Sequence, residues 1–459
     1  MQKTIYPAEI FKAYDIRGVV DEQLSVEVIC AIGKVLGSMA REANVSGLVV
    51  GYDGRLSSPK LAHSLIEGIL LAGCNVYDIG EVTTPMVYFA NYALKTYSGV
   101  MITGSHNPPE YNGLKMVMAA ETLFGDKIQT ILARLEQQEY FDNCTAEHQV
   151  HDITEQYLAQ IVGDVKLARP MKIIVDCGNG VAGKIAPELY RRMGATVREL
   201  FCEVDGNFPN HHPDPSQPAN LQDLIQALAQ SDSELGLAFD GDGDRLGVVT
   251  SDGNIIYPDR QMMLFAADVL SNNPRAKIIY DVKSSRLLAK WIRDHGGNGI
   301  MCRTGHSFIK AKIKETGALL AGEMSGHLFF KDRFSGADDG VYAGARLLEI
   351  LSRVEDPSAV LNGLPNAIST PEINIEVKDC TPHHIVAELQ KSAQFPSSEE
   401  VITIDGMRVE YADGFGLVRA SNTTSVLVLR FEADTQAGLA RIQDEFRNVL
   451  QQYVSSPGF

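Results

Sequence analysis

Three aspartates in the segment DGDGDR are the strongest indication of chemistry in the sequence. Asp240, Asp242 and Asp244 alternate with glycines and follow the apolar run LGLAF. Carboxylates at this spacing can converge on one cation while the glycines let the backbone curl around it. A solvated acidic turn is the less favoured alternative, because crowded carboxylates without a cation repel one another. The segment therefore predicts a metal site.

The residues around these aspartates favour magnesium over calcium. In an EF-hand loop starting at Asp240, the sixth position would be Arg245 instead of glycine and the twelfth Ser251 instead of glutamate. Magnesium takes few protein oxygens and leaves coordination positions for phosphate. We therefore expect Mg²⁺ with a phosphoryl group as its further ligand.

Ser105, in the segment TGSHNP, is a second candidate. It follows the apolar run SGVMI at 98–102, so it lies on a loop where a strand ends, a position that often carries function. Neighbours on an extended chain point to opposite faces, so we expect the adjacent His106 to be poorly placed to deprotonate it. The segment also lacks the G-x-S-x-G pattern of serine hydrolases.

Several basic residues stand at expected strand ends or turns, which suits an anionic substrate. They are Arg17, Lys115, Arg245, Lys283 and Arg419. Each alone is more often a solvated surface charge, and their shared placement favours a binding role. His306, in RTGHSF, is equally compatible with a core or loop histidine and with a ligand-binding one.

The segment GEMSGH carries Glu323, Ser325 and His327 at alternate positions. On an extended segment all three side chains would face one way, which suits recognition of sugar hydroxyls. A helix-capping cluster is the alternative.

The elements that must position these residues form an internal repeat. Apolar strands that run into polar turns occur at 47–54, 172–180 and 277–285, and each is followed by a helical pattern closed by glycine and a second short strand. Three strand–helix–strand units predict three α/β domains with largely parallel sheets. The copies are about 125 and 105 residues apart, which is too long for a solenoid.

Each copy also contains a later apolar strand that ends in a candidate loop. SGVMI precedes TGSHNP, LGLAF precedes DGDGDR, and GALLA precedes GEMSGH. In α/β sheets such strand-end loops collect ligands.

The tail of the chain breaks the repeat. It reads as a strand at 371–377, a helix, three strands and a final helix, which predicts a smaller α+β domain with the segment RASNTTS between its last two strands. The predicted domains are 1–150, 151–254, 255–366 and 367–459.

Composition limits the classes of partner. The chain has 459 residues, 45% of them hydrophobic, and a formal net charge of −17, which disfavours binding to nucleic acid or an anionic membrane. An anionic substrate would therefore need a local basic pocket. No apolar run resembles a signal peptide or a membrane span, and the seven cysteines form no C-x-x-C pair. We expect a cytoplasmic protein without structural zinc.

The ordered segments TGSHNPPEYNGLK, DGDGDR, GEMSGH and RASNTT resemble the bacterial phosphomannomutase/phosphoglucomutase family of the α-D-phosphohexomutase superfamily. The similarity covers essentially the whole chain, including the four-domain layout around a central cleft. It implies that Ser105 is the phosphorylated catalytic residue, and that its phosphate completes the coordination of magnesium at Asp240, Asp242 and Asp244. It also implies small-molecule hexose phosphates as partners, a hexose 1,6-bisphosphate as activator, and a monomer.

The resemblance assigns further roles. The catalytic set is Ser105, Lys115, Arg245, His106 and Arg17, with Lys115 favoured over His106 as general base. The substrate-binding set is Tyr14, Lys283, His306, Glu323, Ser325, His327, Arg419, Ser421, Asn422 and Thr423. Within it, Glu323 and Ser325 would bind sugar hydroxyls, and the segment from Arg419 the phosphate that is not transferred. Ser425 stands where proline is expected, which affects the rigidity of that loop.

The implied reaction interconverts the 1-phosphate and the 6-phosphate of mannose or glucose. It proceeds through two phosphoryl transfers and a hexose 1,6-bisphosphate intermediate. One alternative is a phosphoglucosamine mutase, although glutamine is then expected in place of Met324. Another is a haloacid-dehalogenase-type phosphotransferase with Asp240 as nucleophile, although Asp244 stands where threonine or valine is usual. The third is a phosphosugar-binding protein without catalysis.

Overall fold

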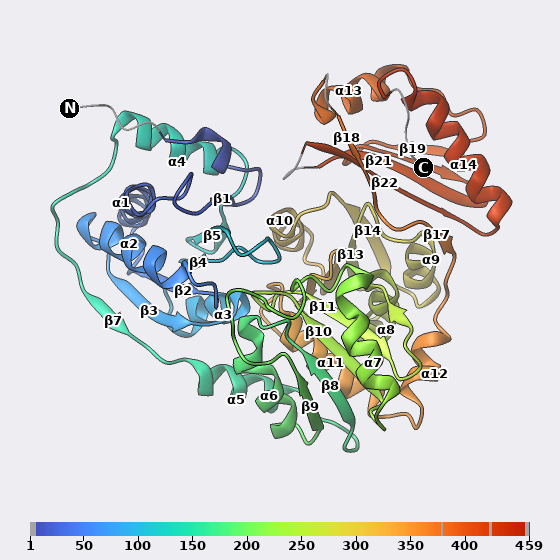
Figure 1. Cartoon of the computed structure of the whole chain (residues 1–459), viewed down its shortest axis with the longest axis horizontal. Helices are drawn as coiled ribbons and strands as arrows, with labels where there is room; N and C mark the ends of the chain where they lie inside the picture. Colours follow the sequence, from blue (N-terminus) through green and yellow to red (C-terminus); the bar gives the residue numbers. More distant parts are fainter. Residues whose placement is uncertain (1–5, 378–379, 422–424, 455–458) are drawn as a thin grey trace. The chain divides into compact units, whose positions relative to one another are not determined.

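The computed structural model describes residues 6–377, 380–421, 425–454 and 459 (Figure 1). The chain forms two compact units, each made of two separate stretches. The first unit contains Met1–Pro258 and Ser325–Gly363, and the second contains Asp259–Met324 and Leu364–Phe459. Within the described residues, no helix is long and apolar enough to cross a membrane.

The first sheet of the first unit has the strand order β1-β5-β4-β2-β3-β7, with β6 paired to β5. Neighbours among β2, β3, β4 and β7 run parallel, and β5 pairs antiparallel with β1, β4 and β6. The elements are β1 (Ile16–Val19), α1 (Val26–Glu42), β2 (Leu48–Tyr52), α2 (Ser58–Leu71), β3 (Val76–Glu81), α3 (Thr84–Ala93), β4 (Gly99–Ile102), β5 (Tyr111–Met118), β6 (Glu121–Thr122), α4 (Asp126–Gln137) and β7 (His148–Val150), after the short 3₁₀ helix η1 (Ala8–Ile10).

Helices α1 and α2 pack closely against each other because glycines face the contact. A Cβ on Gly33 would lie 2.4 Å from the Leu65 carbonyl oxygen, and one on Gly68 would lie 2.0 Å from the Cys30 carbonyl oxygen. The apolar faces of both helices belong to the same buried core as strands β2 and β4. This core holds the ends of β2 and β4, and the loops that follow them, in fixed positions.

The second sheet has the order β12-β11-β10-β8-β9. Strand β8 is parallel to β9 and β10, whereas β10-β11 and β11-β12 are antiparallel. The elements are α5 (Thr154–Asp164), β8 (Lys172–Asp176), η2 (Val181–Lys184), α6 (Ala186–Arg192), β9 (Thr196–Leu200), η3 (Pro218–Leu221), α7 (Gln222–Ala229), β10 (Leu235–Phe239), β11 (Leu246–Thr250) and β12 (Ile255–Ile256).

The stretch Ser325–Gly363 belongs to the first unit, although it follows the third repeat in sequence. It contains β16 (Leu328–Phe330), α11 (Gly340–Leu351) and α12 (Pro357–Asn362), and the two helices pack on this second sheet. The hydroxyl of Tyr190 donates to the Val341 carbonyl at 2.9 Å, and Gly344 leaves room for that ring because a Cβ there would lie 2.3 Å from the hydroxyl. The chain therefore leaves the first unit after Pro258 and returns to it at Ser325.

The second unit contains two sheets. In the first, β13 is parallel to both β14 and β15, and in the other the order is β17-β22-β21-β20-β19 with β18 paired to β22. The elements are α8 (Pro258–Asn272), β13 (Lys277–Asp281), α9 (Arg286–Asp294), β14 (Asn298–Cys302), α10 (His306–Thr316), β15 (Leu320–Gly322), β17 (Ile368–Ser369), β18 (Ile373–Glu376), α13 (Pro382–Ser392), β19 (Glu400–Ile402), β20 (Met407–Tyr411), β21 (Gly414–Ala420), β22 (Val426–Ala433) and α14 (Gln436–Leu450).

The predicted repeat is confirmed by the sheets. Strand pairs β2-β3, β8-β9 and β13-β14 are parallel, and the later apolar strands β4, β10 and β15 each pair in parallel with the first strand of their repeat. The candidate loops thus follow adjacent parallel strands, where α/β sheets form binding sites.

Two details differ from the prediction. The helical pattern at 181–194 is broken into η2 and α6, with Pro187 in the first turn of α6, where a missing N–H costs no hydrogen bond. In the tail, four described strands follow α13 instead of three, because β19 is a short edge strand paired with β20.

Candidate active site

The DGDGDR segment forms a buried loop between β10 and β11. The carboxylates of Asp240, Asp242 and Asp244 are buried, and their nearest oxygens lie within 4.8 Å of one another. Gly243 has φ +74°, in the left-handed region, and a Cβ on Gly241 would lie 2.4 Å from the Ser105 carbonyl oxygen. The glycines therefore allow both the tight curl and the close approach of the serine loop.

Lys115, from β5, supplies positive charge to this cluster. Its ammonium nitrogen lies 2.7 Å from Oδ2 of Asp242 and also donates to Asp244. Burial alone would lower the pKa of Lys115, but the facing carboxylates outweigh burial and raise it. Lys115 is thus a cation that balances part of the aspartate charge.

The charge balance of the loop remains incomplete. Burial, together with the charges of Asp242 and Asp244, raises the pKa of Asp240 well above its usual value. Oδ1 of Asp242 is buried and has no hydrogen-bond partner among the residues that the structure describes. A hard divalent cation would bind these oxygens and relieve the repulsion, so the residues present fit such an ion.

Thr84, at the start of α3, orients Asp242. Its backbone N–H donates to the Asp242 carbonyl at 3.0 Å, and its hydroxyl donates to Asp242 Oδ2 at 2.5 Å. Because Thr84 and Lys115 both occupy Oδ2, Oδ1 is the oxygen left for a ligand. The first repeat thereby shapes the aspartate loop of the second.

Ser105 lies beside the aspartates. Its hydroxyl donates to Asp240 Oδ2 at 3.0 Å, and the residue is buried. Its φ is +49°, a left-handed conformation that is unfavourable for residues other than glycine.

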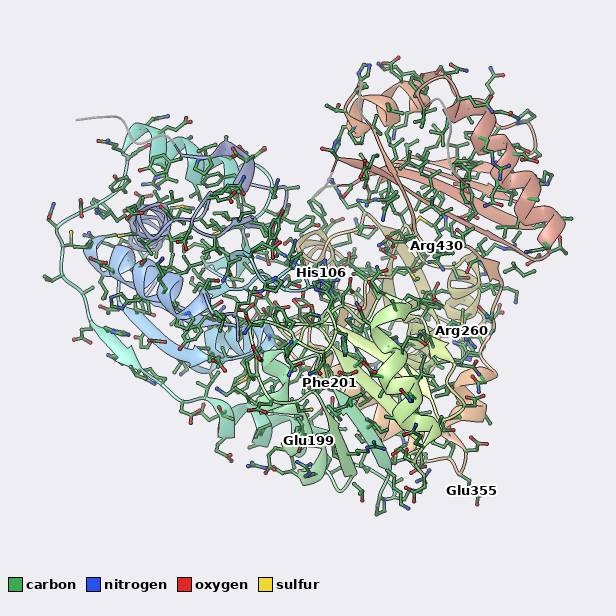
Figure 2. All side chains as sticks on the ribbon, in the orientation of Figure 1. His106, Glu199, Phe201, Arg260, Glu355 and Arg430 are labelled. Carbon is green, nitrogen blue, oxygen red and sulfur yellow. The ribbon has the colours of Figure 1, made fainter. Side chains whose placement is uncertain are left out.

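The expectation that His106 is poorly placed toward Ser105 is wrong. Nδ1 of His106 lies 3.1 Å from Ser105 Oγ, because the left-handed turn at Ser105 replaces the extended backbone on which the expectation rested. His106 is labelled in Figure 2. Its partial burial, and then the charges of Arg245 and Arg17, lower the pKa of His106 well below its usual value, so the imidazole is neutral at pH 7.

Two predicted arginines flank this serine. Arg17 donates to the Gly104 carbonyl at 2.9 Å and to the Asn107 side chain, and its other amino group pairs with Asp15 at 2.6 Å. Arg245 Nε lies 3.6 Å from Asp240 Oδ2. Both are largely buried, so neither is an ordinary surface charge.

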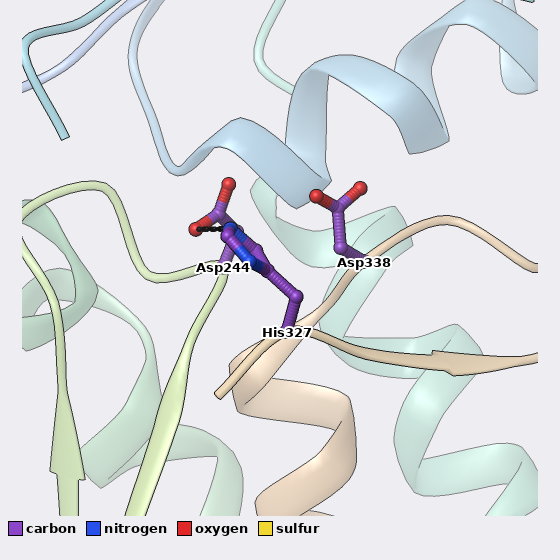
Figure 3. A group of neighbouring side chains, drawn as sticks. All are labelled: Asp244, His327 and Asp338. Carbon is purple, nitrogen blue, oxygen red and sulfur yellow. Dashed lines mark ion pairs between the residues drawn. The ribbon is translucent and has the colours of Figure 1, made fainter. Parts of the chain in front are cut away.

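Figure 3 shows His327 beside Asp244 and Asp338, with the ion pair between His327 Nε2 and Asp244 Oδ1 at 3.2 Å. His327 Nδ1 lies 3.0 Å from the Ser325 hydroxyl. Ligand atoms of these two acids and the histidine also lie within 4.8 Å of one another, so Asp244 belongs to two groups that could hold a cation.

The segment GEMSGH is a turn, and the expectation of an extended segment is wrong. Gly326 has φ +99°, which reverses the chain between Ser325 and His327. Ser325 and His327 meet across this turn and do not project from one strand face. In the second unit, Glu323 is buried and accepts a hydrogen bond from the Gly305 N–H at 2.5 Å.

The second unit contains a further basic group. Lys283 follows β13, is buried, and its ammonium lies 2.5 Å from Glu372. Burial alone would raise the pKa of Glu372, but the charge of Lys283, followed by those of Arg430 and Arg419, lowers it. The carboxylate of Glu372 is thus held in its charged form by three nearby cations.

The loop that carries Lys283 is held by the last domain. Arg408 donates to the Val282 and Ser284 carbonyls at 2.6 Å each, and Arg430, labelled in Figure 2, donates to the Lys283 carbonyl. The guanidinium carbon of Arg408 also lies 3.6 Å from the centre of the Phe415 ring. The two sheets of the second unit therefore share one rigid connection at this loop.

Arg419, at the end of β21, is buried and pairs with Asp405 at 3.0 Å. Asp405 also accepts from the N–H of Thr304, within the RTGHSF segment, at 3.0 Å. Ser421 is half-buried, whereas Asn422 and Thr423 lie outside the described residues. His306 is buried at the start of α10, and Tyr14 is half-buried before β1.

Several residues of the site were missed by sequence reasoning. Asp53 and Arg55 hold the serine loop, and Thr84 holds Asp242. The first pair lies in the polar turn GYDGR after the first repeated strand, and Thr84 lies in TTP at the start of α3. The position of each within three residues of the end of a strand was the available signal.

A buried serine beside a carboxylate loop that fits a divalent cation, in a chain of α/β domains, is typical of phosphoryl-transfer proteins. Four family models match the chain: "Phosphoglucomutase/phosphomannomutase" alpha/beta/alpha domains I, II and III at residues 8–141, 153–253 and 257–367, and the C-terminal domain at residues 372–449. The chain belongs to the phosphoglucomutase/phosphomannomutase family.

Individual relatives agree with this assignment. The chain is 57% identical over 449 residues to a Neisseria gonorrhoeae protein named phosphoglucomutase, with 96% of this chain and 97% of the relative covered. It is 54% identical over 451 residues to the phosphomannomutase/phosphoglucomutase of Pseudomonas aeruginosa, with 98% and 97% covered. A crystal structure of a phosphoglucomutase/phosphomannomutase family protein from Burkholderia thailandensis matches with a TM-score of 0.93 and 53% identity, covering 98% of each chain.

Proposed function

We propose that this protein interconverts hexose 1-phosphates and hexose 6-phosphates, of mannose and glucose, by way of phosphorylated Ser105 and a hexose 1,6-bisphosphate. The observation that carries the proposal is the contact of 3.0 Å between the Ser105 hydroxyl and Asp240 in the buried aspartate loop. The relatives named phosphoglucomutase and phosphomannomutase/phosphoglucomutase support the substrate class.

Asp240, Asp242 and Asp244, with phosphorylated Ser105, would hold a divalent cation, for which we propose Mg²⁺. When bound, such an ion neutralises charge on the phosphoryl group. A hexose 1,6-bisphosphate would load Ser105 with its first phosphoryl group.

The chain's own residues would align and neutralise the transferred group. Arg17 and Arg245 lie beside the serine loop and offer guanidinium donors for phosphoryl oxygens, and Lys115 contributes a third positive charge. His106 Nδ1 is placed to exchange a proton at Ser105 Oγ. For the sugar hydroxyl, the neutral imidazole of His106 is the better general base, because the raised pKa of Lys115 keeps its ammonium charged.

The remaining assignments concern the substrate. Glu323 and Ser325 would bind sugar hydroxyls, and Tyr14, Lys283, His306 and His327 would bind the sugar or the reacting phosphate. The phosphate that is not transferred would be bound by Arg419, Ser421, Asn422 and Thr423.

Peptide mapping after incubation with glucose 1,6-bisphosphate tests the proposal. We expect a stable phosphate on Ser105 that mannose or glucose phosphate discharges, and no phosphate in the Ser105→Ala control. An acid-labile phosphate on Asp240 would support the haloacid-dehalogenase alternative, and no phosphoprotein at all would support a binding protein without catalysis.

The substrate alternative within the superfamily needs a separate measurement. Met324 in GEMSGH favours hexose phosphates over glucosamine phosphate. Among mannose 6-phosphate, glucose 6-phosphate and glucosamine 6-phosphate, we therefore expect the lowest kcat/KM for glucosamine 6-phosphate. A higher kcat/KM for glucosamine 6-phosphate than for both hexoses would instead identify a phosphoglucosamine mutase. We further propose that the protein is a cytoplasmic monomer, which light scattering of the purified protein tests for its oligomeric state.

A further inference from the structure

Arg55 lies directly after β2, and its side chain is buried against the loop that carries Ser105. The residue is only 1% exposed. All five of its side-chain N–H donors have partners, and the first of these is Asp53 Oδ2, which accepts from Nε at 3.2 Å. The others are the carbonyl oxygens of Ser105 at 2.7 Å, Asn107 at 2.6 Å, Pro108 at 2.6 Å and Tyr111 at 3.0 Å.

Asp53 connects this guanidinium to the strand that leads into the loop. Its Oδ2 accepts from the Thr103 hydroxyl at 2.7 Å and from the Gly104 N–H at 3.2 Å. The Thr103 hydroxyl in turn accepts from the Ser105 N–H at 2.7 Å. The peptide groups on both sides of Ser105 are therefore fixed, one through Thr103 and the other by Arg55.

This network stabilises a conformation that the loop would otherwise avoid. A left-handed residue other than glycine costs about 1–2 kcal/mol, so Ser105 at φ +49° needs support from its surroundings. Gly104 permits that support, because a Cβ there would lie 2.4 Å from the Arg55 guanidinium carbon.

The direction of the carbonyl groups matters for a residue that carries phosphate. Carbonyl oxygens bear partial negative charge and would repel a phosphoryl group at Ser105 Oγ. Arg55 binds four of them on one side of the loop, while Ser105 Oγ contacts Asp240.

We propose that Arg55, held by Asp53, is a positioning residue for phosphoryl transfer at Ser105. It fixes the left-handed turn at Ser105 and binds the loop carbonyls away from the phosphoryl group. This inference rests on the proposed phosphoserine chemistry. Arg55 reaches the reacting oxygen only through the loop backbone, so its loss should slow transfer without weakening substrate binding.

Arg55→Lys in the full-length protein is the decisive variant. Lysine has three donors and cannot satisfy four carbonyls and a carboxylate, so the loop should relax. Because a misplacement of about 1 Å can cost roughly 100-fold in rate, we expect kcat and the rate of Ser105 phosphorylation by glucose 1,6-bisphosphate to fall about 100-fold. KM for glucose 1-phosphate should stay within about threefold of wild type.

Arg346→Lys is the matched control. Arg346, on α11, is also 1% exposed and pairs with Asp332 at 3.0 Å. Its replacement therefore removes a buried guanidinium at a position away from the serine loop. We expect it to lower Tm while leaving kcat within about threefold of wild type. An equal loss of kcat in both variants would mean that the effect of Arg55 is only loss of stability, which overturns the proposal.

Thr103→Val provides a second route if Arg55→Lys does not fold. Valine keeps the shape of threonine but removes the acceptor for the Ser105 N–H, so kcat should fall about tenfold with unchanged KM. The proposal is overturned if Arg55→Lys folds and keeps kcat within about threefold of wild type. If Arg55→Lys does not fold, the same result for Thr103→Val overturns it. Failure of wild-type Ser105 to accept phosphate would instead contradict the proposed function, so the two failures are distinguishable.

Discussion

At the scale of single residues, the aspartate loop is a balance of buried charges. Lys115 offsets part of the negative charge through Asp242 and Asp244, and Arg245 lies near Asp240. Thr84 and Lys115 occupy one oxygen of Asp242, and the other is left without a hydrogen-bond partner among the described residues. Individual side chains thus decide both where Ser105 lies and which oxygens face a ligand.

Ser105→Ala should fold normally and lose steady-state mutase turnover by several orders of magnitude. The hydroxyl is the only group that can carry the phosphoryl in the proposed reaction, and the change removes one oxygen from a packed site. Steady-state kinetics and a thermal melt of the same sample check this expectation. Near-native turnover in the variant would contradict the carrier role of Ser105.

Asp242→Asn should lower both the apparent Mg²⁺ affinity and kcat, each by at least about tenfold. The change removes an anionic ligand and weakens the contact of 2.7 Å with Lys115. Activity titrated with Mg²⁺ measures the effect, and Asp252→Asn on the turn after β11 is the control. Chelation of the wild-type enzyme should abolish activity reversibly, and full activity after chelation is incompatible with a metal site.

At the scale of elements, three of the candidate loops follow the carboxyl ends of parallel strands. β4 leads into the serine loop, β10 into the aspartate loop and β15 into GEMSGH. The loop after β13 has the same placement, and Asp281 at its start accepts hydrogen bonds from Ser284 at 2.8 Å and Thr304 at 3.2 Å. Strand ends therefore connect the sheet cores to the groups that would contact substrate.

Asp281 should make stability depend on pH. Burial first, and then the charge of Glu323, raises the pKa of Asp281 to about 6 against the opposing effect of Lys283. The folded state therefore holds this proton more tightly than the unfolded chain, so the stabilisation is complete below pH 4 or so and is lost as pH rises through about 6.

Asp281→Asn removes this dependence. Relative to its effect at pH 4, the variant should gain roughly 2 kcal/mol on wild type by pH 7, from the difference between the two pKa values, since the unfolded aspartate is already partly ionised at pH 4. Urea unfolding of both proteins at several pH values measures the gain. A difference between the two proteins that is constant from pH 4 to 7 would rule out titration of Asp281 in this range.

At the scale of the whole molecule, a large net negative charge is combined with cations that are each paired with an acid. The chain carries −17 overall, and in the second unit Lys283, Arg419 and Arg430 pair with Glu372, Asp405 and Asp259. The division into units also departs from chain order, since Ser325–Gly363 joins the first unit and Leu364–Phe459 the second. The net charge disfavours large polyanions, so binding of a small anionic substrate would depend on individual cations such as these.

Arg419→Ala should lower kcat/KM by roughly 10- to 150-fold, the cost of losing a hydrogen bond to a charged group. Most of the loss should appear in KM, because a clamp on the phosphate that is not transferred acts equally in the ground and transition states. The loss should be similar for mannose 1-phosphate and mannose 6-phosphate. Steady-state kinetics in both directions provides the measurement.

Arg441→Ala is the matched control for this prediction. Arg441 lies in the same domain and pairs with Asp413 at 2.5 Å, but its side chain is 38% exposed. We expect both KM values to stay unchanged in this variant. An unchanged KM for both sugars in Arg419→Ala would remove Arg419 from substrate binding.

The sequence by itself determined the repeated α/β units, the strand-end loops and the convergence of the three aspartates. These features are local: apolar runs, glycine positions and alternating carboxylates act over a few residues, so they can be read without knowing the fold. The resemblance of four ordered segments then indicated the family, and the four family models confirm it.

Only the tertiary structure decided how these segments meet. The left-handed turn brings His106 to Ser105, contrary to the extended chain assumed from sequence, and Thr84 reaches Asp242 across 158 positions. Arg55 contacts the Ser105 carbonyl from 50 positions away. Such contacts depend on sheet order and on helix packing, which bring distant residues together by burying whole faces, and no local pattern encodes which side chains will then be neighbours.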